Sequence, residues 1–422
     1  MARYELTRSP FDPFAATYLR AGITLSRQGD VLAYASERPS SPPRTFASRA
    51  ASEEHAARIE RTLHEAWLRA HFRVVDAAAI TRGNELPPRD KLWETILLSP
   101  ADDTAWKEYA QTLTERGEMH DLTELPDEID EPLDPEVTRL RHGFLTAASI
   151  SPLQPAEDWD LPGCLIETLR HPRASFLEEL TLPYAKFDET IEALTILAPI
   201  TVRKLVVGKR FGHRDINDDA YPEMEEVGDA TPVFIALSRL EDVRLRVGRL
   251  HLETLDAPSL RALTIETDTL SPQTVRAISA ASLPKLEHLA LWFGFSDELP
   301  GRRASVDDLA SLFSGAGVPS LRSLSLSHTR LSDGLCTGLS RAPLAAQLET
   351  LDLSKGNLTM SGARLLAESR DTFARLRRLD VSANGLTEEA RELLERTYEE
   401  VVCSWQYHPS WWSPDHPDSS AR

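Results

Sequence analysis

The sequence has few cysteines and no long apolar run, and these two absences limit the classes of protein to which the chain could belong. Its 422 residues include three cysteines, Cys164, Cys336 and Cys403, which lie far apart and form no CxxC pair. An odd number at this spacing argues against a disulfide framework and favours reduced thiols. No stretch of about 18 apolar residues occurs, and the opening MARYELTRSP offers no apolar core for a signal peptide. We therefore expect a soluble, cytoplasmic protein with no membrane partner.

Motifs of common catalytic and cofactor sites are also missing. There is no GxxxxGK[S/T] loop to cradle phosphates, and no GxGxxG follows an expected strand. HExxH, GxSxG and closely spaced Cys/His sets are absent as well. These absences predict a protein that is not an enzyme and that carries neither a cofactor nor a metal.

Positive charge is scarce, and its distribution is uneven. The chain holds 47 basic and 66 acidic residues, a formal net charge of −19. Residues 1–80 are close to balanced and contain no lysine, whereas residues 81–140 hold 6 basic and 16 acidic residues. Nucleic-acid affinity depends largely on neutralised phosphates, so binding through the whole surface is disfavoured.

Three segments near the C-terminus repeat one pattern. LRSLSLSHTRLS begins at Leu321, LETLDLSKGNLT at Leu348 and LRRLDVSANGLT at Leu376. Apolar residues occupy positions 1, 4, 6 and 11 of each, and the pair at 4 and 6 has the two-residue period of a short strand. The residues after each strand have a helical pattern, with candidate N-caps at Ser332, Thr359 and Thr387.

This pattern resembles the leucine-rich-repeat family, and the spacing of about 28 residues resembles its ribonuclease-inhibitor-like subtype. The resemblance implies a horseshoe-shaped α/β solenoid over residues 141–405, with a parallel sheet inside and helices outside. It also implies a turn-bonding Asn at position 9, which only Asn384 supplies, since Gly356 and Thr329 fill the other two places. Weaker copies start at Leu177, Val202, Leu240, Leu260, Leu286 and Tyr398.

Side chains at positions 5 and 7 of such repeats should point away from the core onto the concave sheet. Together with large or charged neighbours, they form the predicted partner-binding strip. Its residues are Arg244, Arg246, Glu266, His288, Trp292, Phe293, His328, Asp352, Lys355, Arg378 and Asp380. Trp292 is either an interface anchor or a ring covered by the insert that follows it. Asp352 and Asp380 should be neighbours of like charge unless Arg378 or Lys355 intervenes.

The front of the chain contains two further segments. Residues 81–140 include a predicted helical hairpin, 92–118, with a core of Leu92, Ile96, Trp106, Tyr109, Ala110 and Leu113 and an acidic linker behind it. Its pattern resembles a short companion domain of bacterial repeat proteins. Residues 1–80 resemble a degenerate WGR domain, a small α+β module, in which LSRQG replaces the Trp-Gly-Arg motif. Residues 406–422 form an aromatic tail, interpreted as a C-terminal cap or a docking peptide.

The leading hypothesis is a non-enzymatic protein-binding scaffold that engages a protein partner through the concave face. One alternative is a nucleic-acid-associated regulator that uses the N-terminal WGR-like domain, where Arg44, Arg49, Arg58 and Arg69 are either phosphate ligands or a solvated face. The other is an acidic inhibitor or immunity-type protein that blocks a basic enzyme.

Overall fold

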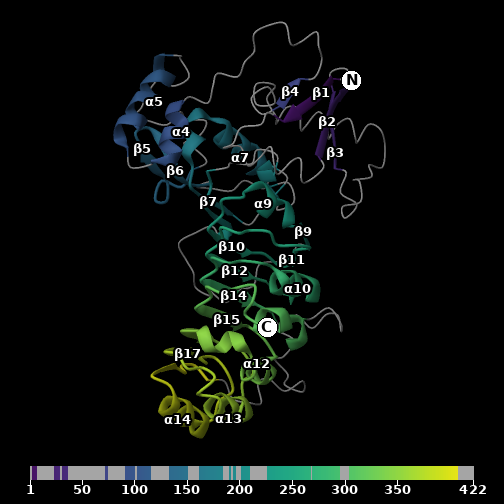
Figure 1. Cartoon of the computed structure of the whole chain (residues 1–422), viewed down its shortest axis with the longest axis vertical. Coiled ribbons are helices and arrows are strands. Elements are labelled where there is room, and N and C mark those ends of the chain that lie inside the picture. Colours follow the sequence, from purple (N-terminus) through teal and green to yellow (C-terminus); the bar gives the residue numbers. More distant parts are fainter. Residues whose placement is uncertain are drawn as a thin grey trace. The chain divides into compact units, whose positions relative to one another are not determined.

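The chain divides into two compact units in the structure, a computed structural model. The described residues are 2–6, 23–28, 31–36, 72–74, 91–99, 102–115, 133–150, 161–183, 190–191, 193–195, 201–209, 226–267, 269–294 and 304–406. Unit 1 comprises residues 1–181, 189–203 and 235–238, and unit 2 comprises 182–188, 204–234 and 239–422. Figure 1 labels the helices and strands of both units.

Four strands near the N-terminus form an antiparallel sheet. They are β1 (Ala2–Leu6), β2 (Ile23–Gln28), β3 (Val31–Ser36) and β4 (Phe72–Val74), in the order β3-β2-β1-β4. β2 and β3 pair as an antiparallel hairpin. The arginines at 44, 49, 58 and 69 lie outside the described residues, and the WGR-like identity stays a prediction.

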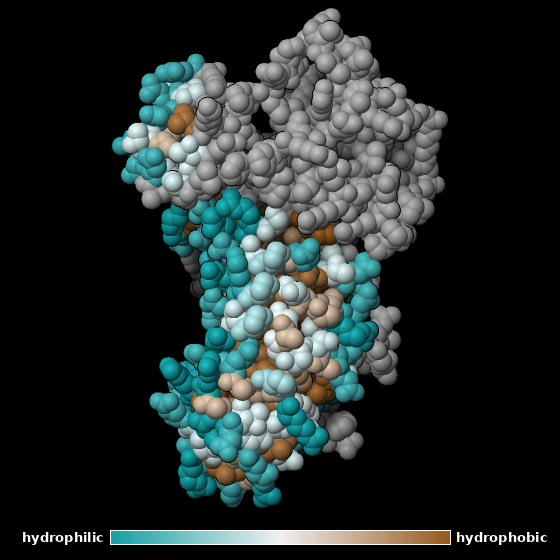
Figure 2. Space-filling view, viewed as in Figure 1, coloured by the Kyte–Doolittle hydropathy of each residue, from teal (hydrophilic) through white to brown (hydrophobic). Residues whose placement is uncertain are grey.

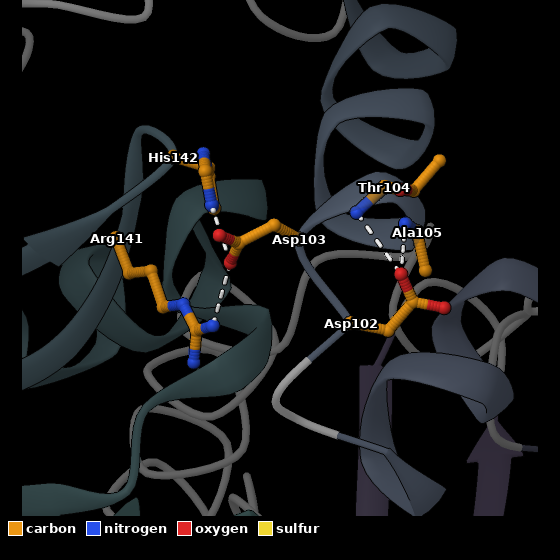
Figure 3. A network of polar contacts seen from close by, with 6 residues as sticks. All are labelled: Asp102, Asp103, Thr104, Ala105, Arg141 and His142. Carbon is orange, nitrogen blue, oxygen red and sulfur yellow. Dashed lines mark hydrogen bonds and ion pairs between the residues drawn. The ribbon is translucent and has the colours of Figure 1, made fainter.

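The helical hairpin of unit 1 matches its predicted core. α4 (Lys91–Leu98) and α5 (Asp103–Glu115) bury Ile96, Trp106, Tyr109, Ala110 and Leu113, and leave Leu92 half-buried. Asp102 caps α5, since its Oδ1 accepts hydrogen bonds from the backbone N–H groups of Thr104 at 3.0 Å and Ala105 at 3.4 Å (Figure 3).

The rest of unit 1 packs aromatic rings against this hairpin. It contains β5 (Arg139–Arg141), β6 (Phe144–Ser149), α7 (Leu161–Arg170), the 3-10 helix η1 (Pro172–Phe176) and β7 (Glu179–Pro183). β5 and β6 pair antiparallel, and β6 and β7 pair parallel. The Phe176 ring lies 4.5 Å from that of Trp106 and 5.2 Å from that of Phe144, so the hairpin and the strands share one core.

Unit 2 contains a sheet of eight parallel strands among its described residues. They are β8 (Lys204–Lys209), β10 (Asp242–Arg246), β12 (Ala262–Glu266), β14 (His288–Trp292), β15 (Ser323–Ser327), β16 (Thr350–Asp352), β17 (Arg378–Asp380) and β18 (Glu400–Val402). Neighbouring strands pair in the order of the sequence (Figure 1). Leu263, Leu289, Leu324, Leu351 and Leu379 stand opposite one another and are buried, which confirms a strand–helix solenoid.

Helices connect the later strands, and a second small sheet lies beside the earlier ones. The helices are α10 (Pro272–Ala280), η2 (Val306–Leu309), α11 (Ala310–Phe313), α12 (Ser332–Leu339), η3 (Pro343–Gln347), α13 (Met360–Glu368) and α14 (Glu388–Thr397). β9 (Glu226–Asp229), β11 (Arg249–His251) and β13 (Thr269–Leu270) form the second sheet, and α9 (Thr231–Ala236) follows β9. The second sheet was not predicted.

Turn chemistry agrees with the sequence in most places. Thr359 and Thr387 cap α13 and α14 as predicted. The Asn384 amide donates to the carbonyls of Leu353, Val381 and Ser382, and its Oδ1 accepts from the Leu358 N–H. The prediction for Ser332 was wrong. It is the first residue of α12, and its hydroxyl accepts from the Asn357 N–H instead.

Candidate binding surface

The strand register aligns the outward side chains of unit 2 into rows. One row, at position 5 of the repeats, contains Arg244, Thr264, Ala290, Ser325, Asp352, Asp380 and Val402. Another, at position 7, contains Arg246, Glu266, Trp292 and Ser327. We call the face of the sheet that carries these two rows the open face. Figure 2 shows that hydrophilic side chains mix with paler and apolar ones over unit 2.

Two arginines enclose one buried carboxylate on the open face. Glu266 is 3% exposed and forms ion pairs with Arg244 and with Arg246, whose Nε lies 3.6 Å from Glu266 Oε2. The Arg244 side chain is 51% exposed, whereas that of Arg246 is 13% exposed. Both guanidinium groups therefore share Glu266 as a partner, and the Arg244 side chain also reaches solvent.

Trp292 lies in a stack of its own chain's side chains. Its ring is 3.8 Å from that of His328 and nearly parallel to it, at 16°. The Lys355 ammonium lies 5.1 Å from the centre of the same ring, within cation–π range. Trp292 remains partly exposed. The insert that could cover it, residues 295–303, lies outside the described residues.

The neighbouring carboxylates Asp352 and Asp380 stand side by side as predicted. Asp352 accepts hydrogen bonds from the Ser325 hydroxyl at 2.7 Å and the Ser354 N–H at 2.8 Å, and Asp380 accepts from the N–H of Ser382 at 2.9 Å. Arg378 pairs with Glu400 instead of intervening between them. Hydroxyl and amide donors therefore hold the two side chains in place on the open face.

Three of the predicted contact residues are buried and do not reach solvent. Glu266, Phe293 and His328 are between 3% and 6% exposed. β14 ends at Trp292, and the next residue, Phe293, turns into the core. His328 has a positive φ of 51°, which turns it out of its strand toward the Trp292 ring. These three residues were predicted to contact a partner, but their burial gives them a supporting role beneath the surface instead. Arg244, Arg246, His288, Trp292, Asp352, Lys355, Arg378 and Asp380 keep some exposure.

A charge pattern at position 2 of the repeats was missed, although the sequence displays it. Seven successive copies of unit 2 carry acid and base in strict alternation just before the strand. They are Glu241, Arg261, Glu287, Arg322, Glu349, Arg377 and Glu399. The backbone N–H of Arg261 donates to the Glu241 carbonyl, and this bond recurs along the series to Arg377. Comparing position 2 across the copies would have found it. We call this series the charge ladder.

A separate polar cluster lies in unit 1. Asp103 Oδ1 accepts from Arg141 Nη2 at 2.7 Å and lies 3.1 Å from His142 Nε2 (Figure 3). The hydrogen bond from Arg141, followed by that from His142, holds the pKa of Asp103 below its usual value. A cavity of about 560 Å³ adjoins it, lined by Lys107, Ala110, Gln111, Thr114, His142 and Gly143. The cluster ties α5 to the β5–β6 turn.

Within the described part of the chain, no group of three or more His, Cys, Asp or Glu side chains is arranged to hold a metal ion. None of the described helices is both long and apolar enough to cross a bilayer.

Comparison with known proteins gives only distant similarities. No family model and no curated protein matches the chain. Among solved structures, a protein from Bacteroides fragilis is 18% identical, with a TM-score of 0.45, over 96% of this chain and 98% of its own. An internalin from Listeria monocytogenes is 12% identical, with a TM-score of 0.27, over 63% of this chain and 82% of its own.

Proposed function

We propose that unit 2 is a leucine-rich-repeat scaffold, without catalytic activity of its own, that binds a protein partner through its open face. The observation that carries the proposal is the Trp292 stack. A large aromatic ring stands partly exposed near the middle of the sheet, in contact with His328 and within cation–π range of Lys355. Preordered aromatic side chains lose little entropy on binding, and tryptophan and arginine dominate the energetics of protein interfaces.

The surroundings of Trp292 favour a polar, charge-selective interface. The exposed Arg244 side chain lies on one side, and Asp352 and Asp380 lie on the other side. A partner with acidic groups opposite Arg244 and basic groups opposite the two acids would match this face. Opposed charges of this kind set orientation and association rate more than affinity.

The proposal is tested by affinity capture with the whole chain as bait. Trp292→Ala and Arg244→Ala are compared with Arg364→Ala, an exposed arginine on α13 that carries the same charge change as Arg244→Ala. Proteins from cells that carry the gene should be retained by the parent chain and by Arg364→Ala, and should be depleted with the two open-face variants. Equal recovery of the same proteins with all four baits would refute the proposal.

A further inference from the structure

The charge ladder ends on an acid at the last strand of the sheet. Arg261 pairs with Glu287, with Nη1 2.5 Å from Oε1, and Arg322 Nε lies 3.9 Å from Glu349 Oε1. The β17–β18 register places Glu399 beside Arg377, and Glu400 forms an ion pair with Arg378. Each acid inside the series has a base on both sides. Glu399 has one on its inner side only, so the next member of the series would be basic.

The outer edge of β18 also has backbone groups available for pairing. The Glu400 N–H donates to Arg377, and the carbonyls of Val402 and Ser404 accept from the strand beside them. Backbone groups alternate between the two sides of a strand, so the N–H and carbonyl of Val401 and the N–H of Cys403 point to the outer side. The Cys403 carbonyl accepts from Gln406 Nε2 at 3.1 Å. Among the described residues, β18 has a strand on one side only.

Trp405 follows this edge in an exposed position. It is 85% exposed, and its φ of 56° places it in the same left-handed conformation as His328, Lys355 and Ala383, which occupy position 8 of earlier repeats. A tryptophan face in water attracts a guanidinium or ammonium group. The ring thus adds a cation-binding element at the C-terminal end of the same edge.

We propose that the β18 edge binds an extended basic segment of a partner protein, which adds as a further strand to the sheet. Backbone hydrogen bonds to Val401 and Cys403 would supply affinity, and arginine side chains opposite Glu399 and Glu400 would continue the charge ladder. This surface is distinct from the open face, and either surface can bind without the other.

Two other occupants fit the edge less well. The β18 edge of a second copy, residues 398–406, contains no basic residue that could stand opposite Glu399 and Glu400. The segment 407–422 contains three prolines and a single arginine. Proline lacks the N–H that a strand partner must donate, and the segment supplies no adjacent basic pair.

The test uses the full chain and synthetic peptides as probes. A labelled ten-residue peptide with two adjacent arginines followed by alternating valine and threonine is titrated by fluorescence anisotropy. A peptide with glutamates in place of the arginines tests charge. An arginine peptide N-methylated at alternate residues tests backbone pairing. Glu399→Arg is compared with Glu253→Arg, the same charge change at an exposed residue after β11.

The arginine peptide should bind and protect the amides of Val401 and Cys403 from hydrogen exchange. N-methylation should weaken binding more than about tenfold, since several hydrogen bonds are lost. Glu399→Arg should weaken it about fivefold, and Glu253→Arg should leave it unchanged. Equal binding of the methylated peptide, or no effect of Glu399→Arg, would overturn the proposal. Tighter peptide binding by the double variant Trp411→Ala/Trp412→Ala would overturn the proposal, because the C-terminal tail would then be the occupant of the edge. Dimers detected by light scattering would overturn it as well, because a second copy of the chain would then be the occupant.

Discussion

Replacing Gly356 by Asn tests how closely the turns of the solenoid are packed. The resemblance to leucine-rich repeats favours Asn at this position, so family statistics alone would expect a gain in stability. The structure predicts the opposite. A Cβ at Gly356 would lie 2.2 Å from Ser332 Oγ and 2.9 Å from Asn384 Oδ1. Both oxygens accept backbone N–H groups from the turn that contains Gly356, those of Asn357 and Leu358.

The cost follows from these contacts. Overpacking a buried site costs about 1–3 kcal/mol, and each displaced hydrogen bond adds about 1 kcal/mol. Gly356→Ala, which adds only the Cβ, should therefore lower the free energy of unfolding by about 3 kcal/mol, and Gly356→Asn by at least as much. In a Ser332→Ala background the nearest atom is gone, so Gly356→Ala should cost at least about 1 kcal/mol less than it does alone.

Urea unfolding followed by circular dichroism and tryptophan fluorescence measures these differences. Gly334→Ala is the matched control, because Gly334 is exposed on α12 and its nearest contact to an added Cβ is Val306 at 3.1 Å. Its effect should stay within about 1 kcal/mol, since alanine favours the helix. A neutral or stabilising Gly356→Asn would refute the reasoning.

Three further predictions concern single buried or partly buried groups. Burial raises the pKa of Asp308, but hydrogen bonds from Ser305 and then from Arg276 outweigh it, so the pKa lies below its usual value. The ionised carboxylate therefore stabilises the folded chain above pH about 4, and this contribution is lost as the pH falls through the lowered pKa. Asp308→Asn should thus cost about 1 kcal/mol in urea unfolding at pH 6 and little at pH 3. Burial raises the pKa of the Cys336 thiol, so a disulfide reagent at pH 8 should modify at most two cysteines in the folded chain and three in urea. Glu266→Gln should lower the free energy of unfolding by about 2 kcal/mol, more at low salt, because Arg244 and Arg246 lose their ion pairs with this carboxylate.

The features that were predictable from sequence are those that repeat. Leucines at positions 4 and 6 mark the strands, since a two-residue period buries only one face. Asn384 was predictable because one side chain serves several backbone groups of its turn. The hairpin core was predictable from its helical spacing, with Trp106 and Tyr109 buried as expected.

Features that depend on local backbone conformation were not predictable. The positive φ at His328 turns its ring under Trp292, and nothing in the residue type signals that turn. The inward turn of Phe293 depends on where β14 ends. The strands β9, β11 and β13 are two to four residues long, too short for a periodic pattern.

The most direct test of the open-face role is the affinity of a captured partner for the parent chain and for Trp292→Ala, measured by calorimetry. A hot-spot tryptophan contributes about 2 kcal/mol or more, so the dissociation constant should rise at least about 30-fold, while Arg364→Ala should leave it unchanged. An unchanged dissociation constant for Trp292→Ala would contradict binding through this face.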